Sequence, residues 1–519
     1  MGKLIMKNNL TISDNSHKLR KSEIVLISCI VFQLIMYLLP IRYGDGYFCD
    51  ELYQIAMSHH ICWGGVDVPP LTPFLLSIVR HLFGMSLYAL RLLPAISGIA
   101  IIYLVYLMVK KLEGNFIAYL IALVCITLEP LQIAMSSLYT YDYMNRLIWA
   151  IMLYLVLLLI KTDNKKYWIY FGIFAGLGMM TKWSVLFLGA GICGALILTN
   201  RRKDLKSPQI WIGGILALLI FTPYIIWNYN NGFPTFEFMS GWSSGHASGS
   251  MIKYFLQIIV FTNLLSLPIL ILSVYYFLFN KDGKKFRMLG IAFIILLVLV
   301  LYAGPKFYLI TAYLPILYAG GSVLVGKYTE RLKIKWLTYI YIVLLILSAI
   351  LLVPLVRPIL PVKTLIKYYS VLISGKDFHY QGSKQLPQWF SDRFGWKNLT
   401  QKVAEVYNTL TANEKRYTVI YTSNYSQAGA ISFFGKKYEL PNAISGHNQF
   451  YFFGPGKNIV KTMIVVENSS LEHYKKLFKY VKYEGEVSYC YGKKNKIWLC
   501  KDPKFKSIKD AWPNIKHFN

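Results

Sequence analysis

Residues 336–356 read WLTYIYIVLLILSAILLVPLV, an uninterrupted stretch without a charged side chain. Its length matches the hydrocarbon core of a bilayer, so it predicts a membrane-spanning helix. Outward from it, ten further apolar blocks predict spans near 24–40, 87–109, 115–134, 143–160, 167–181, 184–199, 209–228, 253–279, 288–303 and 307–325. The composition agrees, because 55% of the 519 residues are hydrophobic and only 15% are charged. A soluble protein of this size would need more charge on its surface.

The basic residues indicate the orientation of these spans. If the N-terminus is cytoplasmic, every even-numbered connection carries a basic cluster, and Lys and Arg favour cytoplasmic loops. The clusters are Lys110 and Lys111; Lys161, Lys165 and Lys166; Arg201, Arg202, Lys203 and Lys206; Lys281, Lys284, Lys285 and Arg287; and Lys327, Arg331, Lys333 and Lys335. The net charge of +30 is therefore explained by topology and by attraction to membrane lipids, rather than by a nucleic-acid partner.

This threading predicts an α-helical polytopic protein of the cytoplasmic (inner) membrane with a cytoplasmic segment at 1–23. The first span lacks a following cleavage site, so it is expected to be a retained signal anchor. The eleven spans form a domain over 24–356, and the outer loop 41–86 contains a short amphipathic stretch, 71–84, expected to lie at the membrane interface. The tail 357–519 follows an odd number of spans and is therefore expected outside.

The tail differs from the rest in composition. Polar residues alternate with aromatics, and 417–422, 463–466 and 497–500 are typical of short strands. Residues 398–411 have the pattern of an amphipathic helix, so a small extracytoplasmic α/β domain is predicted. Cys490 and Cys500 flank a candidate hairpin turn, and either a cross-strand disulfide or two free thiols fit that spacing.

Acidic residues are scarce, so their positions are informative. Asp50 and Glu51 follow the first span, and Asp142 is at the outer mouth of the fourth. Such carboxylates could act as a general base toward an acceptor hydroxyl, or could hold a divalent metal. Helix capping by Asp50 and a solvated position for Asp142 are the alternatives.

Basic residues at the outer face complement these acids. Lys182 and Lys306 are candidates for binding a phosphate, with snorkelling to the interface as the alternative for each. His60 and Asp67, in the same outer loop as Asp50, are candidate site-lining residues, and a structural role for the histidine is the alternative.

Several motifs in this order resemble glycosyltransferase family 39, which includes protein O-mannosyltransferases and lipid A aminoarabinose transferases. They are Tyr47-Phe-Cys-Asp-Glu-Leu-Tyr53, Trp63-Gly-Gly-Val-Asp-Val-Pro-Pro-Leu71, Arg91-Leu-Leu-Pro94, Gly176-Leu-Gly-Met-Met-Thr-Lys182, Gly232-Phe-Pro-Thr-Phe-Glu-Phe238, Lys306-Phe-Tyr308 and Tyr313-Leu-Pro315. In the tail, Thr422-Ser-Asn-Tyr-Ser-Gln-Ala-Gly-Ala430 and Ser445-Gly-His-Asn448 look like the soluble domain of bacterial members. Val68 stands where relatives often have histidine.

The resemblance implies a GT-C fold and a polyprenyl-phosphate-linked sugar donor, with a lipid, glycan or protein as the acceptor. It implies that Asp50, with Glu51 beside it, is catalytic and that Asp142 is a second acidic position. It also implies that Lys182, Lys306 and Tyr308 lie near the donor phosphate. A polytopic transporter or lipid flippase that uses the same carboxylates as coupling sites is the alternative from the residues alone.

Overall fold

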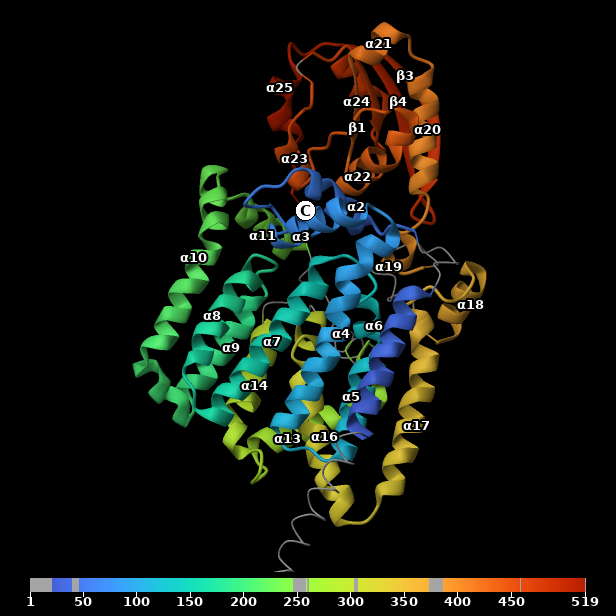
Figure 1. The fold of residues 1–519 in the computed structure, drawn as a ribbon. Helices are drawn as coiled ribbons and strands as arrows, with labels where there is room; N and C mark the ends of the chain where they lie inside the picture. Colours follow the sequence, from blue (N-terminus) through green and yellow to red (C-terminus); the bar gives the residue numbers. More distant parts are fainter. Residues whose placement is uncertain are drawn as a thin grey trace, which may run out of the picture. The chain divides into compact units, whose positions relative to one another are not determined.

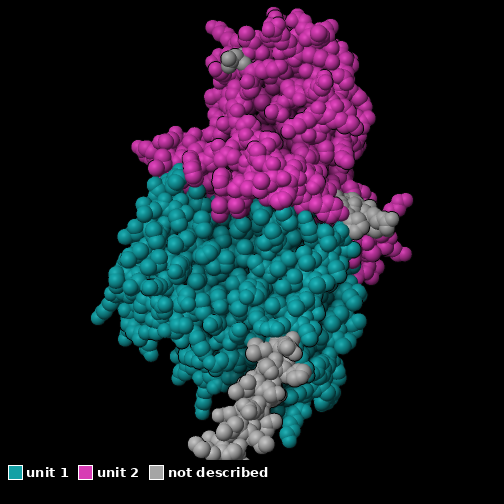
Figure 2. Space-filling model, viewed as in Figure 1, with its two compact units in different colours: residues 1–39, 91–223, 246–357 teal, residues 40–90, 224–245, 358–519 magenta. Residues whose placement is uncertain are grey.

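The structure is a computed structural model that describes residues 21–39, 46–245, 258, 261–302, 307–372, 386–457 and 459–518 (Figure 1). The chain divides into two compact units, coloured separately in Figure 2. The first consists of residues 1–39, 91–223 and 246–357. The second consists of residues 40–90, 224–245 and 358–519, so it gathers three segments that are far apart in the sequence.

The first unit is helical. Its elements, some of which continue past its bounds, are the helix Lys21–Leu38, α4 (Leu87–Lys111), α5 (Phe116–Thr127), α6 (Pro130–Met135), α7 (Tyr141–Thr162), α8 (Lys166–Met179), α9 (Val185–Ile197), η1 (Asn200–Lys206), α10 (Pro208–Asn230), η2 (Leu264–Ser266), α13 (Leu267–Leu278), η3 (Lys284–Phe286), α14 (Arg287–Tyr302), α15 (Phe307–Thr311), α16 (Leu314–Arg331), α17 (Lys335–Leu352) and η4 (Val353–Leu355). Small residues bring some of these helices close together: a Cβ on Gly321 of α16 would lie 2.0 Å from the carbonyl oxygen of Ile269 on α13.

The outer surface of this bundle is apolar, as a lipid-facing surface requires. On α10, Trp211, Ile215, Leu218 and Leu219 are each more than half exposed. Six described helices are long and apolar enough to cross a membrane, or up to seven if the bent pair α9 and η1 is one span. The prediction of an integral membrane protein is therefore confirmed, whereas the count of eleven spans stays a prediction.

The shorter helices explain the difference between these counts. The expected span 115–134 consists of α5 and α6, which are separated at Leu128 and Glu129 just before Pro130. Likewise, 307–325 contains the short α15 before α16, and the expected span 253–279 includes residues 253–257, which lie outside the described residues.

The second unit contains the helices α2 (Cys49–His59), α3 (Leu71–Phe83), α11 (Pro234–Gly245), α18 (Val362–Leu372), α19 (Gln388–Ser391), α20 (Trp396–Asn408), α21 (Ala412–Arg416), α22 (Tyr425–Phe434), η6 (Gly435–Tyr438), α23 (Gln449–Phe453), α24 (Leu471–Leu477), α25 (Ile508–Ala511) and η7 (Trp512–Ile515). Its strands are β1 (Thr418–Thr422), β2 (Thr462–Val466), β3 (Phe478–Tyr489) and β4 (Lys493–Pro503), in the order β1-β2-β4-β3. β1 pairs parallel with β2, and the other two pairs are antiparallel.

The predicted α/β tail is thus confirmed. The three expected strands are β1, β2 and part of β4, and the expected helix 398–411 is α20. β3 was not expected from the sequence. The expected interfacial stretch 71–84 is the helix α3, on which Leu82 and Phe83 are strongly exposed.

The hairpin register decides between the two cysteine alternatives. Cys490 begins the turn after β3, whereas Cys500 on β4 is opposite Val481. Both thiols are free. The two positions are separated along the hairpin rather than facing each other, so the spacing does not produce a cross-strand pair.

One helix contact in this unit matters for the site. α2 packs against α22, and a Cβ on Gly429 of α22 would lie 2.9 Å from the carbonyl oxygen of Leu52 on α2. Only a glycine permits so close an approach, and Tyr425 is one helical turn from it on the same face. The contact therefore brings the first turn of α22 to the first turn of α2.

Candidate active site

The first turn of α2 carries two acidic residues with different surroundings. Glu51 is fully buried, and its Oε2 accepts a hydrogen bond of 2.9 Å from the backbone N–H of Phe48. A glutamate at the third helical position that reaches back in this way caps the helix. The capping role that the sequence allowed for Asp50 is therefore held by Glu51.

Asp50 is left to face another part of the unit. Its Oδ1 accepts a hydrogen bond of 3.1 Å from the hydroxyl of Tyr425 and lies 3.6 Å from the Cys49 thiol. Burial raises the pKa of Asp50 to about 6, against the lowering effect of the Tyr425 and Cys49 bonds, while the charges of Asp67 and Asp392 raise it further. A carboxyl group with a pKa in this range can both take and release a proton near neutral pH.

Asp67 lies in the loop after α2 and is more completely bonded. Its Oδ1 accepts from the hydroxyl of Tyr53 at 2.7 Å, and its Oδ2 accepts from the side-chain amide of Asn448 at 3.0 Å. The Tyr53 hydroxyl in turn accepts the backbone N–H of Gln449 at 2.9 Å. Burial raises the pKa of Asp67 to about 6, although these hydrogen bonds act in the opposite direction.

An aromatic contact joins the two carboxylates. The rings of Tyr53 and Tyr425 stack with centroids 4.3 Å apart, and each donates its hydroxyl to one of the two aspartates. Within the described ranges, neither Asp50 nor Asp67 takes part in an ion pair. The second unit therefore holds two coupled carboxylates whose charge the described residues leave uncompensated.

A third acid lies nearby and does have a cation. Asp392 is buried, and its Oδ1 is 3.1 Å from Lys493 Nζ and 3.0 Å from the Ser391 hydroxyl. The Cys49 thiol lies 3.8 Å from its Oδ2. Because Lys493 neutralises Asp392, the charge of Asp392 raises the pKa of Asp50 less than an unpaired charge would.

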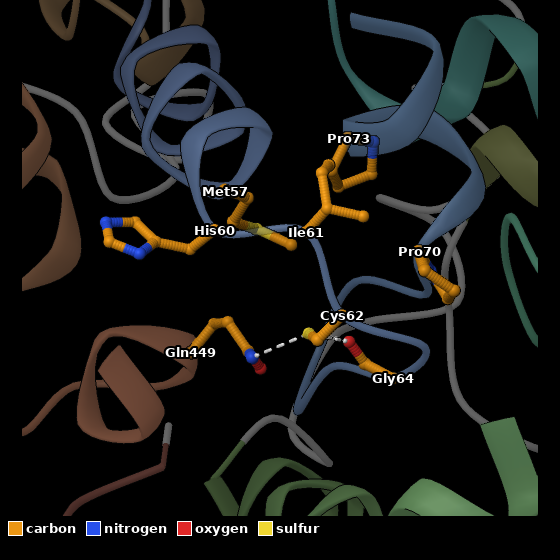
Figure 3. Close-up of a pocket in the computed structure, with 8 residues that line it drawn as sticks. All are labelled: Met57, His60, Ile61, Cys62, Gly64, Pro70, Pro73 and Gln449. Atoms are coloured by element: carbon orange, nitrogen blue, oxygen red, sulfur yellow. Dashed lines mark hydrogen bonds between the residues drawn. The ribbon is translucent and has the colours of Figure 1, made fainter. Parts of the chain in front are cut away.

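The other outer-loop candidate, His60, ends α2 away from Asp50. It stacks on Phe453 with centroids 4.4 Å apart. Figure 3 shows that it lines a small hollow together with Met57, Cys62 and Gln449, among others. Gln449 reaches toward the Cys62 thiol at 3.5 Å, and its backbone N–H bonds Tyr53, so the hollow adjoins the Asp67 network.

In the first unit, the structure brings two predicted residues together. Lys182, in the turn between α8 and α9, forms an ion pair with Asp142 in the first turn of α7. Lys182 Nζ also lies 4.5 Å from the centre of the Tyr141 ring. Beside this pair, the hydroxyl of Ser184 bonds Asn145 Oδ1 at 3.0 Å. Lys306 lies outside the described residues, as does the side chain of Tyr308.

Several residues were missed from the sequence. Tyr425 and Asn448 lie within the two tail motifs that carried the family resemblance, so the signal was present but had no assigned role. Glu129 and Arg146 form a buried ion pair of 2.5 Å in the first unit. The break at Glu129-Pro130 could have indicated this ion pair, because an acid inside an apolar block needs a partner.

The described residues contain no group of three or more His, Cys, Asp or Glu side chains able to hold a metal.

Comparison with known proteins shows what this chain is similar to. Residues 67–227 match the family model described as dolichyl-phosphate-mannose-protein mannosyltransferase. The crystal structure of ArnT from Cupriavidus metallidurans in the apo state aligns with a TM-score of 0.57 at 14% identity, covering 91% of this chain and 97% of that one. The structure of ArnT bound to undecaprenyl phosphate gives a TM-score of 0.56 at the same identity and coverage. No curated protein matches the sequence.

The apolar helices, the small sheet and the likeness to ArnT define an integral membrane protein of the GT-C fold. With the family match over 67–227, the chain is a glycosyltransferase family 39-like protein. These findings support a membrane glycosyltransferase.

Proposed function

We propose that this protein transfers a sugar from a polyprenyl-phosphate donor to an extracytoplasmic lipid, glycan or protein by inverting displacement. The observation that carries the proposal is Asp50, a partly buried carboxylate with a pKa near 6 and a tyrosine hydroxyl on one oxygen. Among the described residues, its Oδ2 accepts no hydrogen bond, which leaves an oxygen for an acceptor group. By contrast, both oxygens of Asp67 are bonded.

In the proposed reaction, ionised Asp50 takes the proton of an acceptor hydroxyl or amine. The acceptor atom then forms a bond to the anomeric carbon of the sugar from the face opposite the phosphate. The bond between the anomeric carbon and the phosphate oxygen breaks, and its electron pair leaves with polyprenyl phosphate. Configuration at the anomeric carbon is thereby inverted.

The leaving phosphate needs positive charge, and Lys182 is the candidate that the structure describes. Its ion pair with Asp142 keeps the ammonium group in one place, so a phosphate would meet an oriented cation. Lys306 and Tyr308 are proposed to contact the same phosphate. His60 and Asp67 are proposed to line the acceptor side. The site and the tail are proposed to face outward from the inner membrane.

The test is release of free polyprenyl phosphate by purified protein supplied with an envelope lipid extract that contains sugar-charged carriers. Replacement of Asp50 by Asn should lower the release rate by about 10²- to 10⁴-fold, the range typical of a lost general base. Asp510→Asn, an exposed change in the same unit, is the control and should leave the rate unchanged. Near-wild-type release by Asp50→Asn would remove Asp50 from the reaction. Lipid movement by the wild type without any release would favour a flippase.

A further inference from the structure

The carboxylate network is assembled from segments that are far apart in the sequence. Tyr425 donates to Asp50 across 375 positions of the chain, and Asn448 donates to Asp67 across 381. Both donors belong to the C-terminal tail, while both acids belong to the loop after the first predicted span. The tail therefore contacts the proposed base directly and is more than a separate module tethered to the bundle.

The structure holds Tyr425 in place from several directions. Asn424 caps α22 by accepting the backbone N–H of Gln427 at 3.0 Å, which fixes the first turn that carries Tyr425. The ring of Tyr425 is stacked on Tyr53, and its centroid lies 5.0 Å from that of His447. The hydroxyl is thus aimed at Asp50 by a ring that contacts both Tyr53 and His447.

Asn448 is held by the last residues of the chain. Its backbone has a φ of 49°, and its N–H donates to the carbonyl of His517 at 3.1 Å. His517 in turn donates its backbone N–H to Gly446. This backbone position shapes the loop, and the side-chain amide of the same residue donates to Asp67.

We infer that Tyr425 is a positioning residue for Asp50, and that Asn448, through Asp67 and Tyr53, sets the second carboxylate beside it, so that the C-terminal tail completes the active site. The inference rests on the proposed role of Asp50 as the base. It adds that the tail controls both where Asp50 points and at which pH it becomes ionised.

The physical reason is the balance of groups that face Asp50. The Tyr425 hydroxyl and the Cys49 thiol favour its ionised form, while Asp67 and the Lys493-paired Asp392 disfavour it. Cys490 also faces Asp392, and the Tyr53 hydroxyl, which donates to Asp67, is close enough to Asp50 to interact with its charge. Removal of the Tyr425 hydroxyl should therefore raise the pKa of Asp50, whereas removal of the Asp67 charge should lower it.

The experiment is the pH dependence of polyprenyl phosphate release by full-length protein. Because the base acts when ionised, the rate rises with pH around the pKa of Asp50. In Tyr425→Phe the midpoint of this rise should move up by about one pH unit, since a hydrogen bond to a charged group is worth roughly that much. Tyr438→Phe, the same substitution on η6 of the same unit, is the matched control and should keep the wild-type midpoint.

Asp67→Asn supplies a second measurement of opposite sign, with a downward shift of the midpoint. The fold can accept it, because the buried Oδ1 of Asn448 has no partner among the described residues. A flip of the Asn448 amide would turn that oxygen toward the new amide at position 67. Midpoints of both variants within the scatter of the Tyr438→Phe control would overturn the inference.

The two proposals fail in different ways. If the wild type releases no polyprenyl phosphate, the proposed function is wrong, and if Asp50→Asn keeps its activity, Asp50 is not the base. If Asp50→Asn is inactive while Tyr425→Phe and Asp67→Asn keep the wild-type midpoint, the function stands and only the positioning role of the tail is lost. A Tyr425→Phe variant with a lower rate and an unmoved midpoint counts against the inference as well, because a purely structural defect lowers the rate without shifting the profile.

Discussion

At the scale of single residues, Asp50 and Glu51 are adjacent but have separate tasks. Glu51 turns back to the N–H of Phe48 and is fully buried, whereas Asp50 turns toward Tyr425. The capping bond of Glu51 holds the first turn of α2, and that turn carries Asp50. The acidic pair thus combines one carboxylate for structure with one for the proposed chemistry.

This division predicts different outcomes for two similar substitutions. Glutamine can accept the same backbone N–H, so Glu51→Gln should keep most of its turnover, while Glu51→Ala should destabilise the protein by about 1 kcal/mol through loss of the cap. Release assays together with thermal unfolding would measure both effects. A turnover loss in Glu51→Gln as large as that in Asp50→Asn would instead make Glu51 part of the chemistry.

The sequence predicted the candidate acids but not the partners of Asp50 and Asp67. Asp50, Asp67 and Asp142 stand out because carboxylates are rare in an apolar chain. Tyr425 does not, because it is one of 40 tyrosines, and its importance depends on a contact across 375 positions. Only the packing of α22 on α2, which depends on Gly429, brings that tyrosine to Asp50.

At the scale of elements, strands and helices with a regular apolar pattern are predictable from the sequence, whereas interruptions within an element are not. Three strands and the helix α20 were expected where they occur. β3 was missed, because its exposed face is rich in charged and polar residues and because Gly485 follows an irregularity in its register. The apolar block 115–134 predicts one helix, whereas the Glu129-Pro130 pair divides it into α5 and α6. Proline and buried charge alter an element in ways that average hydropathy does not reveal.

The hairpin register makes a chemical prediction. With Cys500 opposite Val481 and Cys490 in the turn, no disulfide should join these two cysteines even in an oxidising compartment. Alkylation of the unfolded, non-reduced protein followed by peptide mass spectrometry should find both thiols modified. Isolation of a Cys490–Cys500 linked peptide would mean that the strands pair in another register, and a reduced sample processed in parallel would control for incomplete alkylation.

At the scale of the whole molecule, the three segments that make up the second unit constrain the membrane topology. Its three segments, 40–90, 224–245 and 358–519, form one compact body and therefore lie on one side of the membrane. An even number of crossings must separate each segment from the next. The predicted spans satisfy this condition, with six between the first two segments and four between the last two. The long helices alone do not supply such a count, because between the first two segments they are α4, α7 and α10. At least one further crossing is therefore needed there, either by the bent pair α9 and η1 or by the shorter apolar helices.

This parity predicts the result of topology mapping. Reporters that are active only outside the cytoplasm should be active when fused after residue 245 or in the tail, and inactive when fused within the basic stretch Asn200–Lys206. The reason is that the tail shares a compact body with the outer loop, whereas Arg201, Arg202 and Lys203 are retained on the cytoplasmic side. A cytoplasmic reporter fused at the same three positions should give the reverse pattern. Activity of one reporter both after residue 245 and within Asn200–Lys206 would place both sites on the same side of the membrane. In that case α10 would not cross the membrane as a single span, and the predicted topology would be wrong at that helix.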